Sequence, residues 1–231
     1  DIYDENLAKT EFLEQFDTLF NTNNSDATAL HKLPTSYDYI RLGHPLSCIL
    51  EWAIAQLHSI KAENVISFSS QTIPILAILR KNLLEHKNTQ IIYTGELPAM
   101  FDAEVIKRIY GYQFELKHIE KAADITVFDG STIFVSQDDT ISANTLSENI
   151  DFFINIYTQL GSILVVNGEQ NKHYISDIQH VRRRETIAMT PANSLSALQS
   201  LVNKAPFHIS TNNLETNKAS ALDSITSITG A

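Results

Sequence analysis

The sequence has little of what several protein classes require. Its 231 residues include one cysteine and seven glycines, and 17 Lys and Arg stand against 27 Asp and Glu, a net charge of −10. A lone cysteine excludes an intramolecular disulfide, and Cys48 lies in an apolar stretch where a buried structural thiol is expected. Nucleic-acid binding needs basic patches that this composition lacks. No apolar run approaches the roughly 18 residues of a membrane span, so we expect a cytoplasmic protein that binds neither nucleic acid nor membrane.

Motifs with catalytic or metal-binding meaning are also missing. There is no G-x-S-x-G elbow, no P-loop, no G-x-G-x-x-G and no H-E-x-x-H. His173, Asp177 and His180 are spaced to share one helix face, but a solvated face explains them better than a metal site, and we expect no metal. Two further charged groups are typical of solvent-facing helices: Glu11, Glu14 and Asp17, and the basic run Arg182-Arg183-Arg184.

What the chain does have is a regular alternation of apolar patterns, with 43% hydrophobic residues to build a core. A helical period predicts helices at 4–20, 45–60, 74–86, 102–110, 172–184, 194–202 and 212–228. Short apolar runs predict strands at 65–68, 90–93, 112–116, 125–128, 133–135, 152–156 and 163–166, and residues 27–44 are expected to be irregular. Strands that alternate with helices predict an α/β fold, a three-layer α/β/α sandwich with a mainly parallel sheet. An N-terminal helix and an extended arm precede it.

The segment at 39–46 reads Y-I-R-L-G-H-P-L. It resembles the Y-S-R-x-x-N-P-T segment of the Cys/Met-metabolism (transsulfuration) enzymes, which depend on pyridoxal phosphate (PLP). The resemblance implies that Tyr39 and Arg41 reach across a subunit interface to the PLP phosphate of a neighbouring chain, because a phenol and a guanidinium both donate hydrogen bonds to phosphate. His44 and Leu46 depart from the pattern.

Two strand ends continue the resemblance. Residues 65–72, V-I-S-F-S-S-Q-T, resemble the family's strand that ends in S-S-G-M before a helix whose N-terminal amides hold the phosphate. Ser70 keeps its type, whereas Gln71 replaces the glycine. Residues 133–140 resemble a strand that ends in V-D-N-T, whose aspartate keeps the pyridine nitrogen protonated. Ser136 stands at that aspartate's position, and its neutral hydroxyl cannot hold the proton well. Asp138-Asp139 is more simply a solvated turn.

The cofactor-lysine segment carries the sharpest departure. Residues 151–161, D-F-F-I-N-I-Y-T-Q-L-G, resemble D-x-x-x-x-S-x-T-K-y-x-G, whose lysine holds PLP as a Schiff base. Thr158 fits the pattern, Ile156 replaces the phosphate-binding serine, and Gln159 replaces the lysine. A glutamine amide cannot form an imine, because its nitrogen lone pair is delocalised into the carbonyl. The resemblance therefore implies the fold of these enzymes without a catalytic residue and without bound PLP.

The resemblance spans about residues 37–221 and implies two regions. Residues 1–46 form an N-terminal helix and interface arm, and residues 47–231 form a PLP-transferase-like large domain without the family's smaller C-terminal domain. The family-equivalent cofactor positions are Tyr39, Arg41, Ser70, Gln71, Ser136 and Thr158.

Three hypotheses follow. The leading one is a non-catalytic homologue that forms a homo-oligomer, or a hetero-oligomer with a related PLP enzyme whose site it completes. The alternative is an active PLP-dependent lyase or transferase of sulfur amino-acid metabolism that uses another lysine, of which Lys172 is the nearest downstream. The third is a scaffold or regulatory protein that reuses the fold, and an exposed apolar face on helix 4–20 would favour it.

Overall fold

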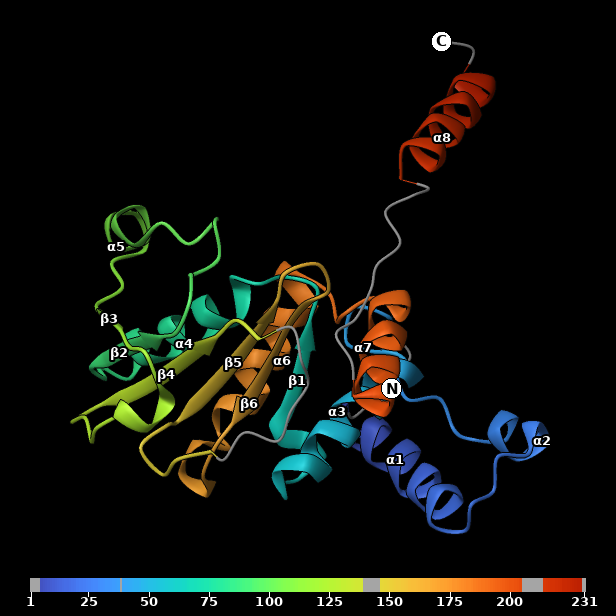
Figure 1. Cartoon of the computed structure of the whole chain (residues 1–231), viewed down its shortest axis with the longest axis horizontal. Coiled ribbons are helices and arrows are strands. Elements are labelled where there is room, and N and C mark those ends of the chain that lie inside the picture. The colour runs from blue at the N-terminus through green and yellow to red at the C-terminus, as the bar shows by residue number, and fades with distance from the viewer. Residues whose placement is uncertain (1–4, 38, 139–145, 205–213, 230–231) are drawn as a thin grey trace.

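A six-stranded sheet forms the centre of the molecule (Figure 1). The computed structural model of the chain describes residues 5–37, 39–138, 146–204 and 214–229. In the order β1-β6-β5-β4-β2-β3, β6 runs antiparallel to both of its neighbours and all other neighbours are parallel, so five strands point the same way. The expected mainly parallel sheet is confirmed. The strands are β1 (Val65–Phe68), β2 (Thr89–Tyr93), β3 (Glu115–His118), β4 (Ser131–Ser136), β5 (Phe152–Tyr157) and β6 (Gly161–Val166).

Helices cover both faces of the sheet, which confirms the three-layer α/β/α sandwich. Successive strand side chains point to opposite faces: Ile133 and Val135 of β4 join one buried cluster and Phe134 joins the other. The first cluster packs under α4 (Ile73–Leu84), α5 (Ala103–Tyr110) and α6 (Tyr174–Glu185), and the second under α3 (Pro45–His58) and α7 (Pro191–Asn203). Because both faces are covered, β1, β5 and β6 are buried throughout, whereas the edge strand β3 is exposed at all four residues.

The N-terminal helix packs on the body of its own chain. α1 (Glu5–Asn21) inserts Phe12 and Leu13 into a third cluster with Tyr37, Leu42 and Cys48. Phe12 and Leu13 are thus covered within the chain, whereas Phe20 near the end of the helix is 58% exposed. Cys48 is fully buried, and burial raises the pKa of its thiol to about 12, so it stays protonated and structural as expected. The arm that follows is not wholly irregular, because α2 (Ala27–His31) forms behind an Asp26 cap.

A buried cluster of charges ties α1, α3 and α6 together. Glu51 of α3 accepts from Lys9 of α1 at 2.5 Å and from Arg182 of α6 at 2.8 Å, and also from the amide and hydroxyl of Ser67 on β1. Burial alone raises the pKa of Glu51, but Lys9 and Arg182 outweigh it and hold that pKa below its ordinary value. The expectation that Arg182 faces solvent is therefore wrong, since its side chain is fully buried, whereas Arg183 and Arg184 are exposed.

Two strand predictions also need correction. Residues 125–128 form no strand, and Val127 is 82% exposed. The physical reason is topological: this run crosses from β3 to β4, which lie on either side of β2, so it passes the sheet without pairing. The strand expected at 112–116 begins later, at Glu115, with buried Tyr112 packed ahead of it.

The C-terminal helix α8 (Leu214–Thr229) stands apart from the sheet in Figure 1. In the described part of the chain, no helix is long and apolar enough to cross a membrane.

Candidate functional site

A pocket of about 500 Å³ lies where β1 and β5 end and β6 begins. Its walls are the loop from Ser69 to the start of α4, the turn between β5 and β6, residues 98–100, and Asn193 at the start of α7. Ligands of parallel α/β sheets bind at the carboxyl ends of the strands, so this is the position in which the sequence placed its site. The structure brings together four of the predicted residues here: Ser70, Gln71, Thr158 and Gln159.

Gln71 ties the two halves of the pocket together. Its side-chain amide donates to the carbonyl of Thr158 at 2.9 Å and to that of Tyr157 at 3.3 Å. Thr158 in turn accepts from Gln137, which follows β4, at 3.1 Å. The glutamine that replaces the family's glycine therefore spans from the start of α4 to the β5–β6 turn, and its side chain takes up space that a glycine would leave open.

The helix N-terminus expected to hold a phosphate has no free amide in its first turn. Ser70 Oγ accepts from the amides of Thr72 and Ile73, although Ser70 lies two residues before the N-cap residue Thr72, whose own side chain makes no capping bond. Pro74 has no N–H, and the amide of Ile75 bonds to the carbonyl of Thr72 at 3.1 Å. An anion placed here would have to displace these existing partners.

The pocket is also electrically neutral. No Lys, Arg, His, Asp or Glu is among the described residues that line it, and Gln159 itself is exposed and forms no hydrogen bond with the described part of the chain. PLP needs an amine for its aldehyde and donors or cations for its phosphate. The described lining supplies hydroxyl and amide donors, but no amine to form an imine and no cation for a phosphate, so it does not match these needs of PLP.

The remaining predicted residues lie outside the pocket. Ser136 is the last residue of β4, paired with Asn155, and does not line it. Tyr39 and Arg41 sit beside the end of α6: Arg41 donates to the carbonyl of Arg183 at 3.2 Å, and the Arg183 guanidinium lies 5.5 Å from the ring centre of Tyr39. Tyr39 is 39% exposed and Arg41 is half-buried. Asp139 lies outside the described residues.

Side-chain amides that the sequence did not single out brace the strand ends. Asn155 of β5 is 5% exposed, accepts from the amide of Asp138 and donates to its carbonyl. Asn193 donates to the carbonyl of Leu160 at 2.9 Å. Asn155 could have been found from the sequence, because it interrupts an otherwise apolar strand and a buried amide requires hydrogen-bond partners.

Two other candidates from the sequence, Lys172 and the exposed face of α6, lie away from this pocket. Lys172 follows β6, whose six residues carry the chain about 17 Å from the Gln159 turn, and it pairs with Glu63 and Glu169. His173, Asp177 and His180 are exposed on α6, and Asp177 pairs with Lys81 at 2.7 Å. The described residues contain no group of three metal-binding side chains.

Comparison with known proteins gives structural similarities only. No family model and no curated protein matches the sequence. Among solved structures, metB from Corynebacterium glutamicum is similar at 15% identity and a TM-score of 0.46, covering 74% of this chain and 55% of that one. Cystathionine gamma-lyase from yeast follows at 13% and 0.48, covering 77% and 54%. Cystathionine gamma synthase from Xanthomonas oryzae pv. oryzae follows at 11% and 0.46, covering 87% and 63%. The chain thus spans little more than half the length of the first two.

Proposed function

We propose that this chain is a cofactor-free homologue of the PLP-dependent Cys/Met-metabolism enzymes that acts as an oligomer partner or regulatory protein. The observation that carries the proposal is the chemistry of the strand-end pocket, where Gln159 stands in the lysine's place. Two further observations support the proposal: the backbone amides at the start of α4 already donate to Ser70, and the side chain of Gln71 bridges the pocket. Several independent losses at one pocket, within a retained frame of strands, are what a non-catalytic homologue would accumulate.

Addition of PLP tests this proposal directly. We expect the absorption spectrum of the purified protein to gain no aldimine band when PLP is added, because the described residues that line the pocket include no lysine. Borohydride reduction and peptide mapping should then recover only scattered adducts on surface lysines. A single lysine labelled in high yield would overturn the proposal in favour of the active-enzyme alternative, and would identify the residue responsible.

A matched variant separates the lost lysine from the lost phosphate site. Gln159→Lys restores an amine to the β5–β6 turn, while Ser70 still accepts from the amides of Thr72 and Ile73 at the start of α4. This variant should react with PLP only as weakly as surface lysines do. A stable aldimine in it would show that the rest of the pocket still accommodates the cofactor.

As part of the same proposal, the exposed Tyr39 and the half-buried Arg41 complete the PLP site of an active homologue in trans. Arg41 donates to the Arg183 carbonyl through Nη1, and it lies beside exposed Tyr39 at the surface. We expect Arg41→Ala to lower the activity of a co-purified PLP enzyme and to weaken its hold on PLP, because a phosphate contact is lost. Arg184→Ala, an exposed neighbour, is the control. An unchanged partner, or purification without any PLP enzyme, would remove this part of the proposal.

A further inference from the structure

A second and larger pocket, of about 660 Å³, lies at the opposite end of the sheet from the Gln159 turn. α1 and α6 form two of its walls, and α3 and the turn before β1 form the others. Its volume is in the range of small-molecule sites. Nothing in the proposed function uses it.

The charges around this pocket do not cancel. Lys9 donates to Glu51, which it shares with Arg182, and to the carbonyls of Ala62 and Val65, which uses all three of its protons. Lys172 is held by Glu63 and Glu169. Glu14 and Asp17, one turn apart on α1, form no ion pair with any described residue. Among the described residues the pocket thus offers two carboxylates without a cationic partner, of which Asp17 also accepts from the Asn21 side-chain amide at 2.7 Å.

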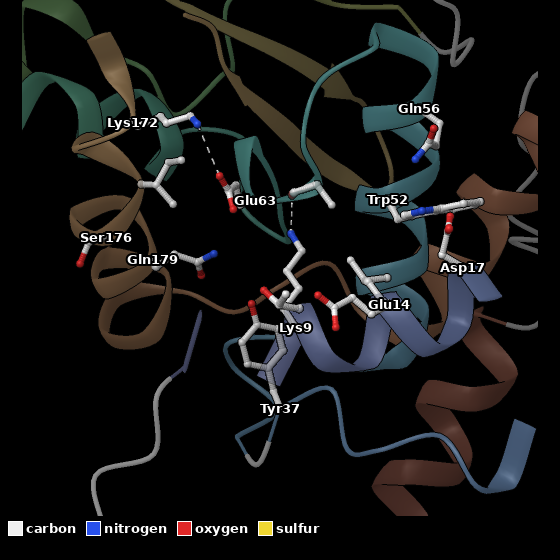
Figure 2. A pocket seen from close by; sticks show the side chains of 14 residues that line it. Lys9, Glu14, Asp17, Tyr37, Trp52, Gln56, Glu63, Lys172, Ser176 and Gln179 are labelled. Atoms are coloured by element: carbon white, nitrogen blue, oxygen red, sulfur yellow. Dashed lines mark hydrogen bonds and ion pairs between the residues drawn. The ribbon is translucent and has the colours of Figure 1, made fainter. Parts of the chain in front are cut away.

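An aromatic surface lies next to these carboxylates. Figure 2 shows Trp52 and Asp17 at one end of the pocket and Lys172 at the other, with Lys9 between them. Edge contacts with Phe16 at 5.3 Å and Phe20 at 5.0 Å between ring centroids fix the half-buried indole. An indole ring attracts cations through its quadrupole, more strongly than other aromatic side chains do. Leu13 and Ile175 add an apolar lining suited to the carbon stem of a ligand.

We propose that this pocket binds a small organic cation, an ammonium or guanidinium on a short apolar stem. The cationic group lies between the carboxylates of Glu14 and Asp17 and the ring of Trp52, and the stem extends along the apolar lining toward α6. A small anion lacks a partner here, because both lysines are already engaged. A ligand in this position joins α1 to α3 and α6.

The chain provides its own reporter, because Trp52 is the only tryptophan. Titration with n-butylammonium chloride and with n-butylguanidinium chloride should each change the intrinsic fluorescence in a saturable manner. Sodium butyrate has a similar stem with the opposite charge, and at equal ionic strength it should produce no saturable change. No saturable response to either cation, or the same response to butyrate, would overturn the assignment.

Charge-removing variants complete the test. Glu14→Gln together with Asp17→Asn should weaken the apparent affinity for the cations at least about threefold. Glu11→Gln is the matched control, an exposed carboxylate on the same helix that does not line the pocket. Circular dichroism and the thermal midpoint should be alike in all three proteins, since these side chains are solvent-accessible. An affinity unchanged by the double substitution would refute the role of the two carboxylates.

Discussion

Glu51→Gln is expected to lower the free energy of unfolding by about 3–5 kcal/mol. Glu51 is fully buried and is the one carboxylate between Lys9 and Arg182, whose side chains are 6% and 0% exposed. The substitution keeps the shape and one acceptor oxygen, so Ser67 can still donate to it. What is lost is the negative charge, and two buried cations then face each other without compensation.

Urea unfolding at neutral pH measures this effect, with Glu11→Gln as the exposed control that should stay within about 0.5 kcal/mol of the parent. A double-mutant cycle gives the mechanism. Lys9→Met should cost less in the Glu51→Gln background than in the parent, because it removes one of the two uncompensated cations. If Glu51→Gln and Glu11→Gln had similar effects, the cluster would contribute little to stability.

The same cluster affects function through α1. Lys9 is the only residue of α1 in the cluster, and α1 also carries Glu14 and Asp17 to the wall of the larger pocket. A loosened α1 in Glu51→Gln should therefore weaken cation binding at Trp52 even where most molecules remain folded. The loss of stability at Glu51 and the weaker cation binding beside Trp52 would then have the same cause, the loosened α1.

The sequence shows in hindsight where this cluster lies. Arg182 stands four residues after Ile178 and eight after Tyr174, on the buried stripe of α6. Glu51 occupies the buried stripe of α3 in the same way, beside Leu50 and Ile54. Opposite charges on the apolar stripes of two helices indicate a buried ion pair. Treating residues 182–184 as a single basic run overlooked that only Arg182 lies on the buried stripe.

The sheet and its helices could be predicted because their apolar patterns are long or fully buried. The run at 125–128 has the same composition as a strand, and its fate depends on which sheet edges β3 and β4 occupy, which no local pattern contains. Ser70 and Gln159 could be placed together because the carboxyl ends of parallel strands share one edge. Tyr39 and Arg41 could not be located, because no regular element carries them.

The larger pocket escaped prediction for a related reason. Glu14 and Asp17 read as an ordinary solvent face on α1, and they are accessible. Their position opposite Lys172 depends on how α1 docks against α3 and α6, through contacts more than 40 residues apart in sequence, such as Lys9 with Glu51. Tertiary docking of this kind has no periodic signature.

Gly161→Ala is expected to lower the free energy of unfolding by about 2–4 kcal/mol, from backbone strain and overpacking together. Gly161 opens β6 at the strand-end pocket with φ +130°, a conformation that residues with a side chain rarely adopt. A Cβ there would overlap the carbonyl oxygen of Phe68, which is backbone of β1 and cannot rotate away. β1 and β6 would have to separate at the pocket, and the bonds from Gln71 to the 157–158 carbonyls would be strained.

Gly111→Ala is the comparison variant, because it adds a side chain at a positive φ where that side chain meets no other atom. Gly111 ends α5 at φ +71°, but a Cβ there would meet nothing within 4 Å, so only the left-handed backbone cost of about 1 kcal/mol applies. The difference between the two variants in urea unfolding therefore contains the clash at the β1–β6 contact and the extra backbone cost of φ +130° over φ +71°. Equal losses would mean that the strands yield without cost at this point, and the strand-end pocket would then be soft enough to open for a ligand its present shape excludes.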